Sequence, residues 1–221
     1  MILLVSKSSG RLATLWAAGV EPLVRVSSVD EETVLGELIR GRRDAGLPAP
    51  SAAEQVQALA RAKALDVMTS TDPQEAEVVV GCDSMLEIAG QVVGKPADAA
   101  QARERWRMMS GGTGTLHTGH FLIRTADGTT AEGVSSATIR FGSPSPAEVE
   151  AYIASGEPLW CAGAFTIDGL GGAFIEGIDG DPHGVVGISL PLLRRLLAAL
   201  GVVWTDLWAP PPATKPVDDA H

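Results

Sequence analysis

Short apolar runs and helical repeats alternate along most of the chain. Residues 2–5 and 78–82 are runs of this kind, and their shortness predicts buried strands. Residues 116–124 and 130–141 predict two longer strands, because Ala126-Asp127-Gly128 between them is a strong hairpin signal. Strands interspersed with helices predict an α/β protein.

Start signals and helical spacing predict several helices. In the first, Leu12, Leu15 and Trp16 have the helical i, i+3, i+4 spacing and Gly19 supplies the stop. The later helices begin at capping residues, namely Ser51, Asp98, Ser145 and Ser189. Residues 36–50, rich in Gly, Pro and Arg, predict a loop or a poorly specified helical insertion, and residues 163–187 predict short strands and tight turns.

Lysine is rare in this chain, since only Lys7, Lys63, Lys95 and Lys215 occur among its 17 basic residues. Lys63 interrupts the apolar stripe of the helix that follows Ser51. One interpretation is a side chain that buries its stem and keeps its charge in water. The other is a buried ammonium group that needs an anionic partner, such as a ligand.

Asp83 follows the apolar run 78–82, so we expect it at the C-terminal end of a buried strand, where ligand sites of open α/β sheets lie. It is either a turn or capping residue, or an oxygen ligand for Mg²⁺ or a base for water. Asp30-Glu31-Glu32 offers a second carboxylate. Acidic runs of this kind also form solvated surfaces or helix starts.

Composition narrows the class of protein. The chain has 221 residues, is 45% hydrophobic and carries a formal net charge of −10. It is expected to fold into a globular body, and its acidity without a basic run disfavours tight sequence-independent binding to polymeric nucleic acid. The N-terminal apolar run is too short for a signal peptide, and no stretch approaches the ~20 apolar residues of a membrane span. We therefore expect a cytoplasmic protein with no membrane partner.

The cysteines and histidines do not indicate a metal or redox centre. Cys82 and Cys161 are outside any CxxC pair, which fits a reducing compartment. His117 and His120 are three residues apart on a predicted strand, so they point to opposite faces. A zinc hydrolase is therefore disfavoured.

A set of motifs occurs in the order and spacing of the Maf family of nucleotide pyrophosphatases, which the chain resembles over roughly residues 3–200. The N-terminal motifs are Ser6-Lys7-Ser8-Ser9-Gly10-Arg11, Asp30-Glu31, Ala60-Arg-Ala-Lys63-Ala64, Gly81-Cys82-Asp83-Ser84 and Gly94-Lys95-Pro96. The C-terminal motifs are Ser155-Gly-Glu-Pro158, Ala162-Gly163-Ala164-Phe165 and Gly180-Asp181 through Val186-Gly187. Each motif alone is weak, and their common register carries the resemblance.

The resemblance implies an α/β fold with one elongated, twisted mixed sheet flanked by helices, and two lobes around a central cleft. It implies a pyrophosphatase domain over residues 1–208, often as a homodimer, and leaves residues 209–221 as a disordered Pro- and Ala-rich tail. The implied activity is hydrolysis of a nucleoside triphosphate to monophosphate and pyrophosphate, with a divalent cation, Mg²⁺ or Mn²⁺.

The site residues carry over from the same resemblance. Asp83 is then a metal ligand or the proton acceptor for the attacking water, and Glu31 is the second metal-proximal carboxylate. The catalytic lysines are Lys63 and Lys95, and Ser6, Ser8 and Arg11 bind substrate. Nearby cations are expected to lower the pKa of Asp83 and keep it ionised, which suits a metal ligand.

Two positions depart from the family pattern. Gly10 stands where the family has its first arginine, so a phosphate contact is lost or supplied by another residue such as Lys7. Asp168 stands where relatives carry Gln or Glu, and we expect it to accept hydrogen bonds from a base with N–H donors. The alternative is that Asp168 bonds only to its local turn.

Two rival interpretations remain at this stage. The first is a nucleotide-binding regulator of cell division or septum formation without turnover, and the presence of Asp83, Lys63 and Lys95 favours an enzyme over it. The second is the related inosine triphosphatase group, which the Ser-x-Ser start and the Gly-Lys-Pro turn disfavour.

Overall fold

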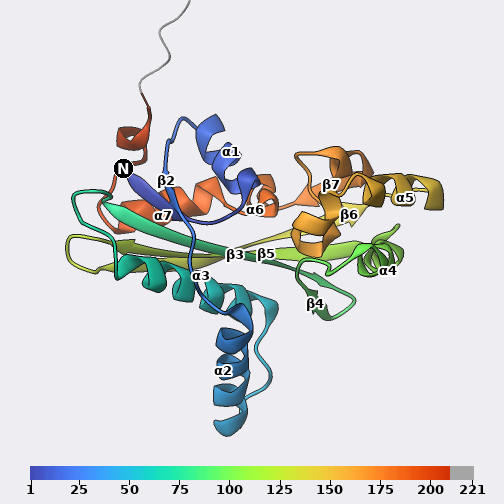
Figure 1. The fold of residues 1–221 in the computed structure, drawn as a ribbon, viewed down its shortest axis with the longest axis horizontal. Coiled ribbons are helices and arrows are strands. Elements are labelled where there is room, and N and C mark those ends of the chain that lie inside the picture. The colour runs from blue at the N-terminus through green and yellow to red at the C-terminus, as the bar shows by residue number, and fades with distance from the viewer. Residues whose placement is uncertain (210–221) are drawn as a thin grey trace, which may run out of the picture.

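One mixed sheet of seven strands organises the protein, and the computed structural model describes residues 1–209 (Figure 1). The strand order is β2-β1-β3-β5-β6-β7, and β4 pairs separately with β3. The strands are β1 (Ile2–Val5), β2 (Leu23–Arg25), β3 (Val78–Ile88), β4 (Gln91–Val93), β5 (Thr113–Arg124), β6 (Thr130–Phe141) and β7 (Ile175–Asp179). The predicted α/β class and single mixed sheet are confirmed.

Helices cover both faces of the sheet. Figure 1 shows α3 below it and α1, α6 and α7 above it, while α4 and α5 lie toward the end that carries β7. The α-helices are α1 (Ser9–Ala17), α2 (Glu31–Asp44), α3 (Ala52–Met68), α4 (Ala99–Met109), α5 (Pro146–Ala154), α6 (Pro182–Val186) and α7 (Leu190–Ala199). Four short 3-10 helices complete the described chain, namely η1 (Glu157–Trp160), η2 (Ala162–Ala164), η3 (Leu170–Phe174) and η4 (Trp204–Leu207).

The partners of β3 change along its length. The parallel strand β1 pairs with it only as far as Gly81, and the antiparallel strand β4 begins to pair at Leu86. On its other side β5 pairs from Val78 to Glu87. Residues 82–85 of β3 therefore have no strand on the β1 side, and this gap is where the main cleft of the molecule opens.

The expectation that Asp83 ends a strand is wrong. Asp83 lies inside the eleven-residue strand β3, opposite Gly119 of β5. The strand continues because β5 supplies a full antiparallel partner after β1 has stopped. Asp83 is nevertheless beyond the carboxyl end of β1, so it still reaches the open edge of the parallel part of the sheet.

Two hydrophobic clusters divide the molecule along β3. One gathers around Val78, Val80 and Cys82 with β1 and α7. The other gathers around Leu86 and Ile88 with the aromatic residues of α4, β6 and the C-terminal half. The gap begins at Cys82, where the first cluster ends on β3, and stops before Leu86, where the second begins, which gives the fold its two lobes.

The predicted helices that begin at capping residues are confirmed. Capping boxes or single caps at Ser51, Asp98, Ser145 and Ser189 start α3, α4, α5 and α7. Trp16, at the predicted helical spacing from Leu12 and Leu15, is 57% exposed, so the buried face of α1 does not extend to it. Of the two alternatives for residues 36–50, the helical insertion is observed as far as Asp44, because Asp30 caps a helix that begins at Glu31. The predicted disordered tail lies, from residue 210 onward, outside the described residues.

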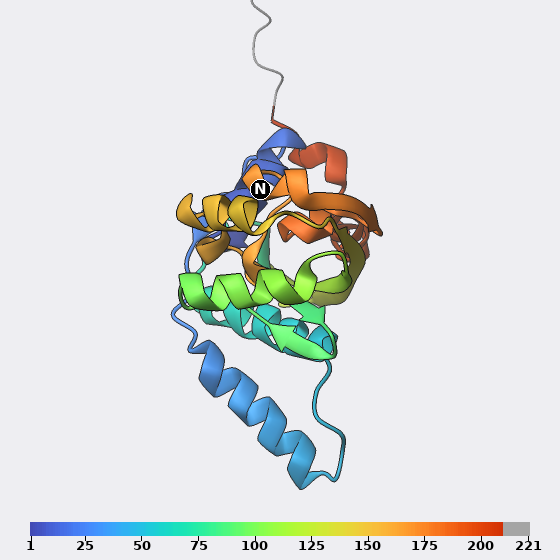
Figure 2. The ribbon, with the colours of Figure 1, turned by 90° about the vertical axis from the view of Figure 1, so that its right-hand side faces the viewer.

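Helix α2 projects away from the rest of the fold (Figures 1 and 2). None of its 14 residues is buried, and Val34 and Leu35 pack beside Val56 and Leu59 of α3. This limited burial explains why the hydrophobic pattern did not reveal it. Its first residue, Glu31, is held beside the cleft.

Two glycines let α3 lie directly on the sheet. A β-carbon on Gly81 would be 2.2 Å from the carbonyl oxygen of Ala60, and one on Gly119 would be 2.5 Å from that of Val56. Real side chains essentially never tolerate such distances, so both positions exclude every larger residue unless α3 moves. Since α3 carries Lys63, these glycines also set the position of its ammonium group.

We predict that Gly81→Ala lowers the free energy of unfolding by about 3 kcal/mol, because the added methyl group meets backbone. Urea denaturation of the purified protein measures this. Gly41→Ala is the matched control, since a β-carbon there meets nothing within 4 Å and the helical position gains up to about 1 kcal/mol. Equal stability of Gly81→Ala and wild type would contradict the close packing of α3.

Candidate active site

The main cleft has a volume of about 1070 Å³ and lies at the unpaired edge of β3. The N-terminal lobe and β3 contribute mostly polar and charged residues, including Ser6, Lys7, Ser8, Arg11, Glu31, Lys63 and Asp83. The opposite wall contributes Glu157, Trp160, Cys161, Phe165, Thr166 and Asp168, and Lys95 comes from the turn after β4. All of the residues predicted from sequence as site residues line this cleft.

Lys63 joins the two predicted metal-proximal carboxylates. Its Nζ atom lies 2.6 Å from Oδ1 of Asp83 and 2.7 Å from Oε1 of Glu31. The three groups come from α3, β3 and the start of α2. The side chain of Lys63 is 13% exposed, so of the two interpretations of its place in the apolar stripe, the buried ammonium with anionic partners is the observed one.

Burial raises the pKa of Asp83, and the charges of Lys63 and Arg11 oppose this shift without reversing it. The prediction that neighbouring cations lower the pKa of Asp83 is therefore wrong. The effect of burial is larger than that of the neighbouring cations, because the carboxylate has lost most of its contact with water. A raised pKa makes Asp83 a better proton acceptor than an ordinary surface aspartate.

Most N–H donors of the Arg11 guanidinium group already bond to groups of the protein itself. Its Nε donates to the carbonyl oxygen of Gly187 at 2.7 Å, and its Nη1 donates to Oγ of Ser6 and to the carbonyl oxygen of Cys82, both at 3.1 Å. Its Nη2 donates to Oγ of Ser84 at 2.9 Å. Since guanidinium has five N–H donors, four are engaged and one remains for a ligand.

A directed chain of hydrogen bonds continues from Arg11 across β3 and β5 to α6, on the face of the sheet that α1 and α6 cover. The hydroxyl of Thr118 donates to the carbonyl oxygen of Gly184 at 2.8 Å, so it accepts from Ser84, whose Oγ is 2.8 Å away. Ser84 in turn accepts from Arg11. The chain therefore ties α1, β3, β5 and α6 together beneath the cleft, and Arg11 positions the N-terminal loop.

The hydroxyls of Ser6 and Ser8 are arranged to donate. Ser6 Oγ accepts from the backbone N–H of Ser8 at 3.0 Å and from Arg11. Ser8 Oγ caps α1 by accepting from the backbone N–H of Arg11 at 3.3 Å. With their acceptor roles taken inside the protein, both hydroxyl hydrogens are available to an anion at the helix N-terminus.

The turn that carries Lys95 is anchored by the buried Arg105, which donates to the carbonyl oxygens of Gly94 and Lys95. Lys95 itself is exposed and faces the cleft. Sequence analysis missed Arg105, although its position three residues after Ala102 and four before Met109 places it on the buried face of α4. It also gave no role to Ser84 and Thr118, although Ser84 directly follows Asp83 in its motif.

The two positions that depart from the family pattern are neighbours in space. A β-carbon on Gly10 would lie 3.4 Å from Oδ2 of Asp168 and 3.0 Å from Cγ1 of Val186. Asp168 also bonds through Oδ1 to the hydroxyl of Thr166 in its own turn. Its Oδ2 points toward the first turn of α1, and the absence of a side chain at position 10 leaves room for this approach.

The described residues contain no group of three or more His, Cys, Asp or Glu that could hold a metal ion by themselves. His120 is buried and accepts at Nε2 from the backbone N–H of Ser189 at 3.0 Å, so its Nδ1 carries the proton that is donated to the carbonyl oxygen of Thr118. This histidine is a structural part of the core.

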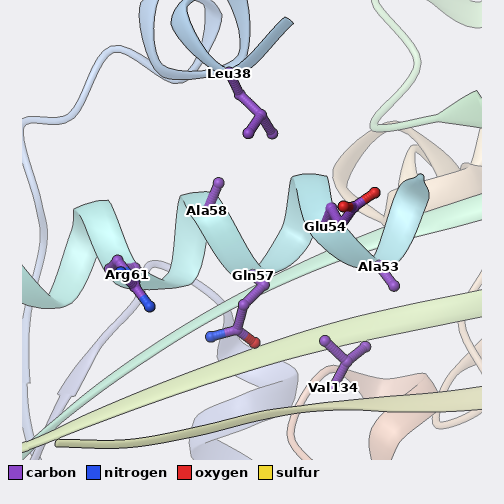
Figure 3. A pocket seen from close by; sticks show the side chains of 7 residues that line it. All are labelled: Leu38, Ala53, Glu54, Gln57, Ala58, Arg61 and Val134. Carbon is purple, nitrogen blue, oxygen red and sulfur yellow. The ribbon is translucent and has the colours of Figure 1, made fainter. Parts of the chain in front are cut away.

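A second, smaller hollow of about 440 Å³ lies between α2, α3 and β6 (Figure 3). Leu38 of α2 faces Ala58 of α3 across it, and Val134 lies on the sheet side. Its cation, Arg61, is paired with Glu132 at 2.7 Å and lies over the ring of Phe121. The hollow is mainly apolar and lacks the convergent polar groups of the main cleft.

Comparison with known proteins agrees with this geometry. The sequence model of the family described as Maf-like protein matches residues 1–200. The chain belongs to the Maf family. Three relatives carry the name nucleoside triphosphate pyrophosphatase. They come from Streptomyces coelicolor (49% identity; 95% of each chain covered), Salinispora tropica (49%; 97% of this chain and 90% of the relative) and Rhodococcus jostii (50%; 93% and 95%).

No helix among residues 1–209 of this Maf chain is long and apolar enough to cross a membrane.

We predict that the Maf fold loses stability in acid partly through His120. Burial lowers the pKa of His120 to about 4, whereas the unfolded chain has the ordinary value of 6.5. Between these values the unfolded state binds the extra proton, so the contribution is complete above pH 6.5 and falls by about 3 kcal/mol as the pH drops to 4.

Urea denaturation at several pH values between 7 and 4 measures this dependence. His120→Gln keeps an acceptor and a donor but does not titrate, so its free energy of unfolding is expected to change less over the same range. A variant with the same slope as wild type would show that His120 is not the titrating group.

Proposed function

We propose that this chain hydrolyses nucleoside triphosphates to nucleoside monophosphate and pyrophosphate. The observation that carries the proposal is the contact of Lys63 with both the buried Asp83 and the exposed Glu31, inside a cleft that also holds Ser6, Ser8 and Lys95. Relatives named nucleoside triphosphate pyrophosphatase, which are 49% and 50% identical to this chain, support the proposal.

The cleft supplies the groups that a triphosphate needs. Lys63 and Lys95 provide positive charge for the phosphate oxygens, and the free hydroxyl hydrogens of Ser6 and Ser8 donate to them. Lys7, exposed at the cleft, supplies the contact that Gly10 does not make. Arg11 contributes its one remaining N–H and keeps the serine loop in position.

The proposed reaction is attack of water on the α-phosphorus. The water oxygen forms a bond to phosphorus, its proton passes to Asp83, and the bond from the α-phosphorus to the oxygen that bridges to the β-phosphate breaks. Pyrophosphate leaves with the bridging oxygen, and Lys63 and Lys95 stabilise its developing charge.

We propose Mg²⁺ or Mn²⁺ as the divalent cation, held by Asp83 and Glu31 together with substrate. The fit rests on their oxygens, which meet at one point where Lys63 now lies 2.6 and 2.7 Å away. Magnesium usually takes one or two carboxylates plus substrate phosphates, so the absence of a larger cluster among residues 1–209 agrees with this mode. When bound, such a cation neutralises phosphate charge.

The homodimer, the cytoplasmic location and the absence of polymeric nucleic acid partners remain predictions. The net charge of −10 supports the last of them, because it repels a polyanion at long range.

The direct test measures pyrophosphate release from a panel of standard and modified nucleoside triphosphates with Mg²⁺ or Mn²⁺. We expect Asp83→Asn to lower kcat by at least about 100-fold, the usual contribution of general acid–base catalysis. Asp44→Asn, on the exposed end of α2, is the matched control and keeps wild-type activity. If wild type and Asp83→Asn share one background rate, the protein is not this enzyme, and nucleotide binding without turnover would favour the division regulator.

Asp168 is expected to influence which nucleobase of the substrate is preferred. An ionised Asp168 accepts hydrogen bonds only, so bases with N–H donors, such as a guanine-type edge or the amino group of cytosine, should have the higher kcat/KM. Asp168→Asn adds a donor and should reduce this preference. Turnover dominated by thymidine or uridine triphosphate would contradict the assignment of Asp168 to the base.

A further inference from the structure

Trp160 is the most exposed large hydrophobic side chain of the described residues. Its exposure is 77%, and the residue lines the main cleft at the end of η1. An isolated exposed tryptophan on a convex surface would need no explanation. A tryptophan at a cleft that also carries cations and hydroxyls is a surface available to a ligand.

The backbone beneath Trp160 is firmly held. The carboxylate of Glu157, three residues earlier, accepts from the hydroxyl of Tyr152 at 2.8 Å and from the backbone N–H groups of Leu170 and Gly171 at 3.0 and 2.9 Å. Pro158 is buried in the same turn. The ring is therefore attached to a rigid support, which reduces the entropy lost when a ligand binds it.

The other aromatic residue that lines the cleft is already used by the core. Phe165 is 3% exposed and packs edge-on against Phe141, with 5.1 Å between the ring centres. Its ring has no free face of useful size. Trp160 is thus the aromatic side chain of this cleft that can offer a ring face to a ligand.

The two walls of the cleft carry side chains of different chemistry. Lys63, Ser6 and Ser8 lie on the N-terminal wall, where phosphate oxygens find cations and hydroxyl donors. Trp160 and Thr166 lie on the opposite wall and combine one flat apolar ring with a hydroxyl group, and Asp168 reaches from the same wall toward the first turn of α1. A nucleobase has the same two properties, namely an apolar face and a polar edge.

We propose that Trp160 stacks on the base of the bound nucleotide. This inference rests on the proposed function, since it takes the phosphates to be bound at the N-terminal wall. Every base has a π-face, so stacking on Trp160 strengthens the binding of all nucleotides, and discrimination between bases is left to edge groups such as Asp168.

The test compares ligands with and without a base. We expect Trp160→Ala to raise KM for nucleoside triphosphates by about tenfold, within the range measured for base stacking, with little change in kcat. Inhibition by inorganic tripolyphosphate, which has no base, should be unchanged. Trp160→Phe should restore most of the affinity. Trp16→Ala, an exposed tryptophan outside the cleft, is the matched control and keeps wild-type KM.

The outcomes distinguish a failure of the stacking role of Trp160 from a failure of the proposed hydrolysis. If Trp160→Ala weakens nucleotide and tripolyphosphate equally, or leaves KM unchanged, the stacking role is overturned while the enzyme activity stands. A change in oligomeric state without a change in KM overturns it too and makes the ring an interface residue. If wild type releases no pyrophosphate, the proposed function fails, and calorimetric binding of a non-hydrolysable nucleotide to wild type and Trp160→Ala still decides on stacking.

Discussion

The direct contact of α3 with the sheet is the constraint on which the rest of the structure depends. Gly81 and Gly119 have no side chains, so the backbone of α3 lies against β3 and β5. This approach brings Nζ of Lys63 within 2.6 Å of Oδ1 of Asp83. The largely buried ammonium group needs such a partner, because a charge removed from water without one is strongly unfavourable. The same contact buries Asp83 and raises its pKa. Packing, charge pairing and the expected acid–base chemistry therefore share one geometric cause.

Arg11 performs the complementary task of joining the N-terminal loop to β3 and to the segment before the C-terminal helix α7. Its hydrogen bonds reach Ser6 in the N-terminal loop, Cys82 and Ser84 on β3, and Gly187 near the C-terminal helix. A guanidinium group can do this because its donors are fixed in one plane and it stays charged. The serine loop is consequently positioned before any substrate binds, which is what efficient recognition of a triphosphate requires.

The sequence predicted the elements that bury a regular hydrophobic face, such as β1, β5, β6 and α3. It left α2 undecided between a loop and a poorly specified helical insertion, because a helix without buried residues leaves no apolar period to detect. The motifs brought Lys63, Asp83 and Glu31 together correctly. The bonds of Arg11 were not predictable, since they join residues up to 176 positions apart. The sign of the pKa shift of Asp83 depends on burial, which spacing does not reveal.

The unpaired segment of β3 has a consequence for association between chains. An open strand edge presents free backbone groups that another strand can join, and long edges of this kind promote aggregation. Here the open part is limited to residues 82–85, and Arg11 already occupies the carbonyl oxygen of Cys82. So short a stretch offers too few ladder bonds for an intruding strand. The protein can thus keep backbone accessible within its cleft without offering neighbouring molecules a template for β-sheet growth.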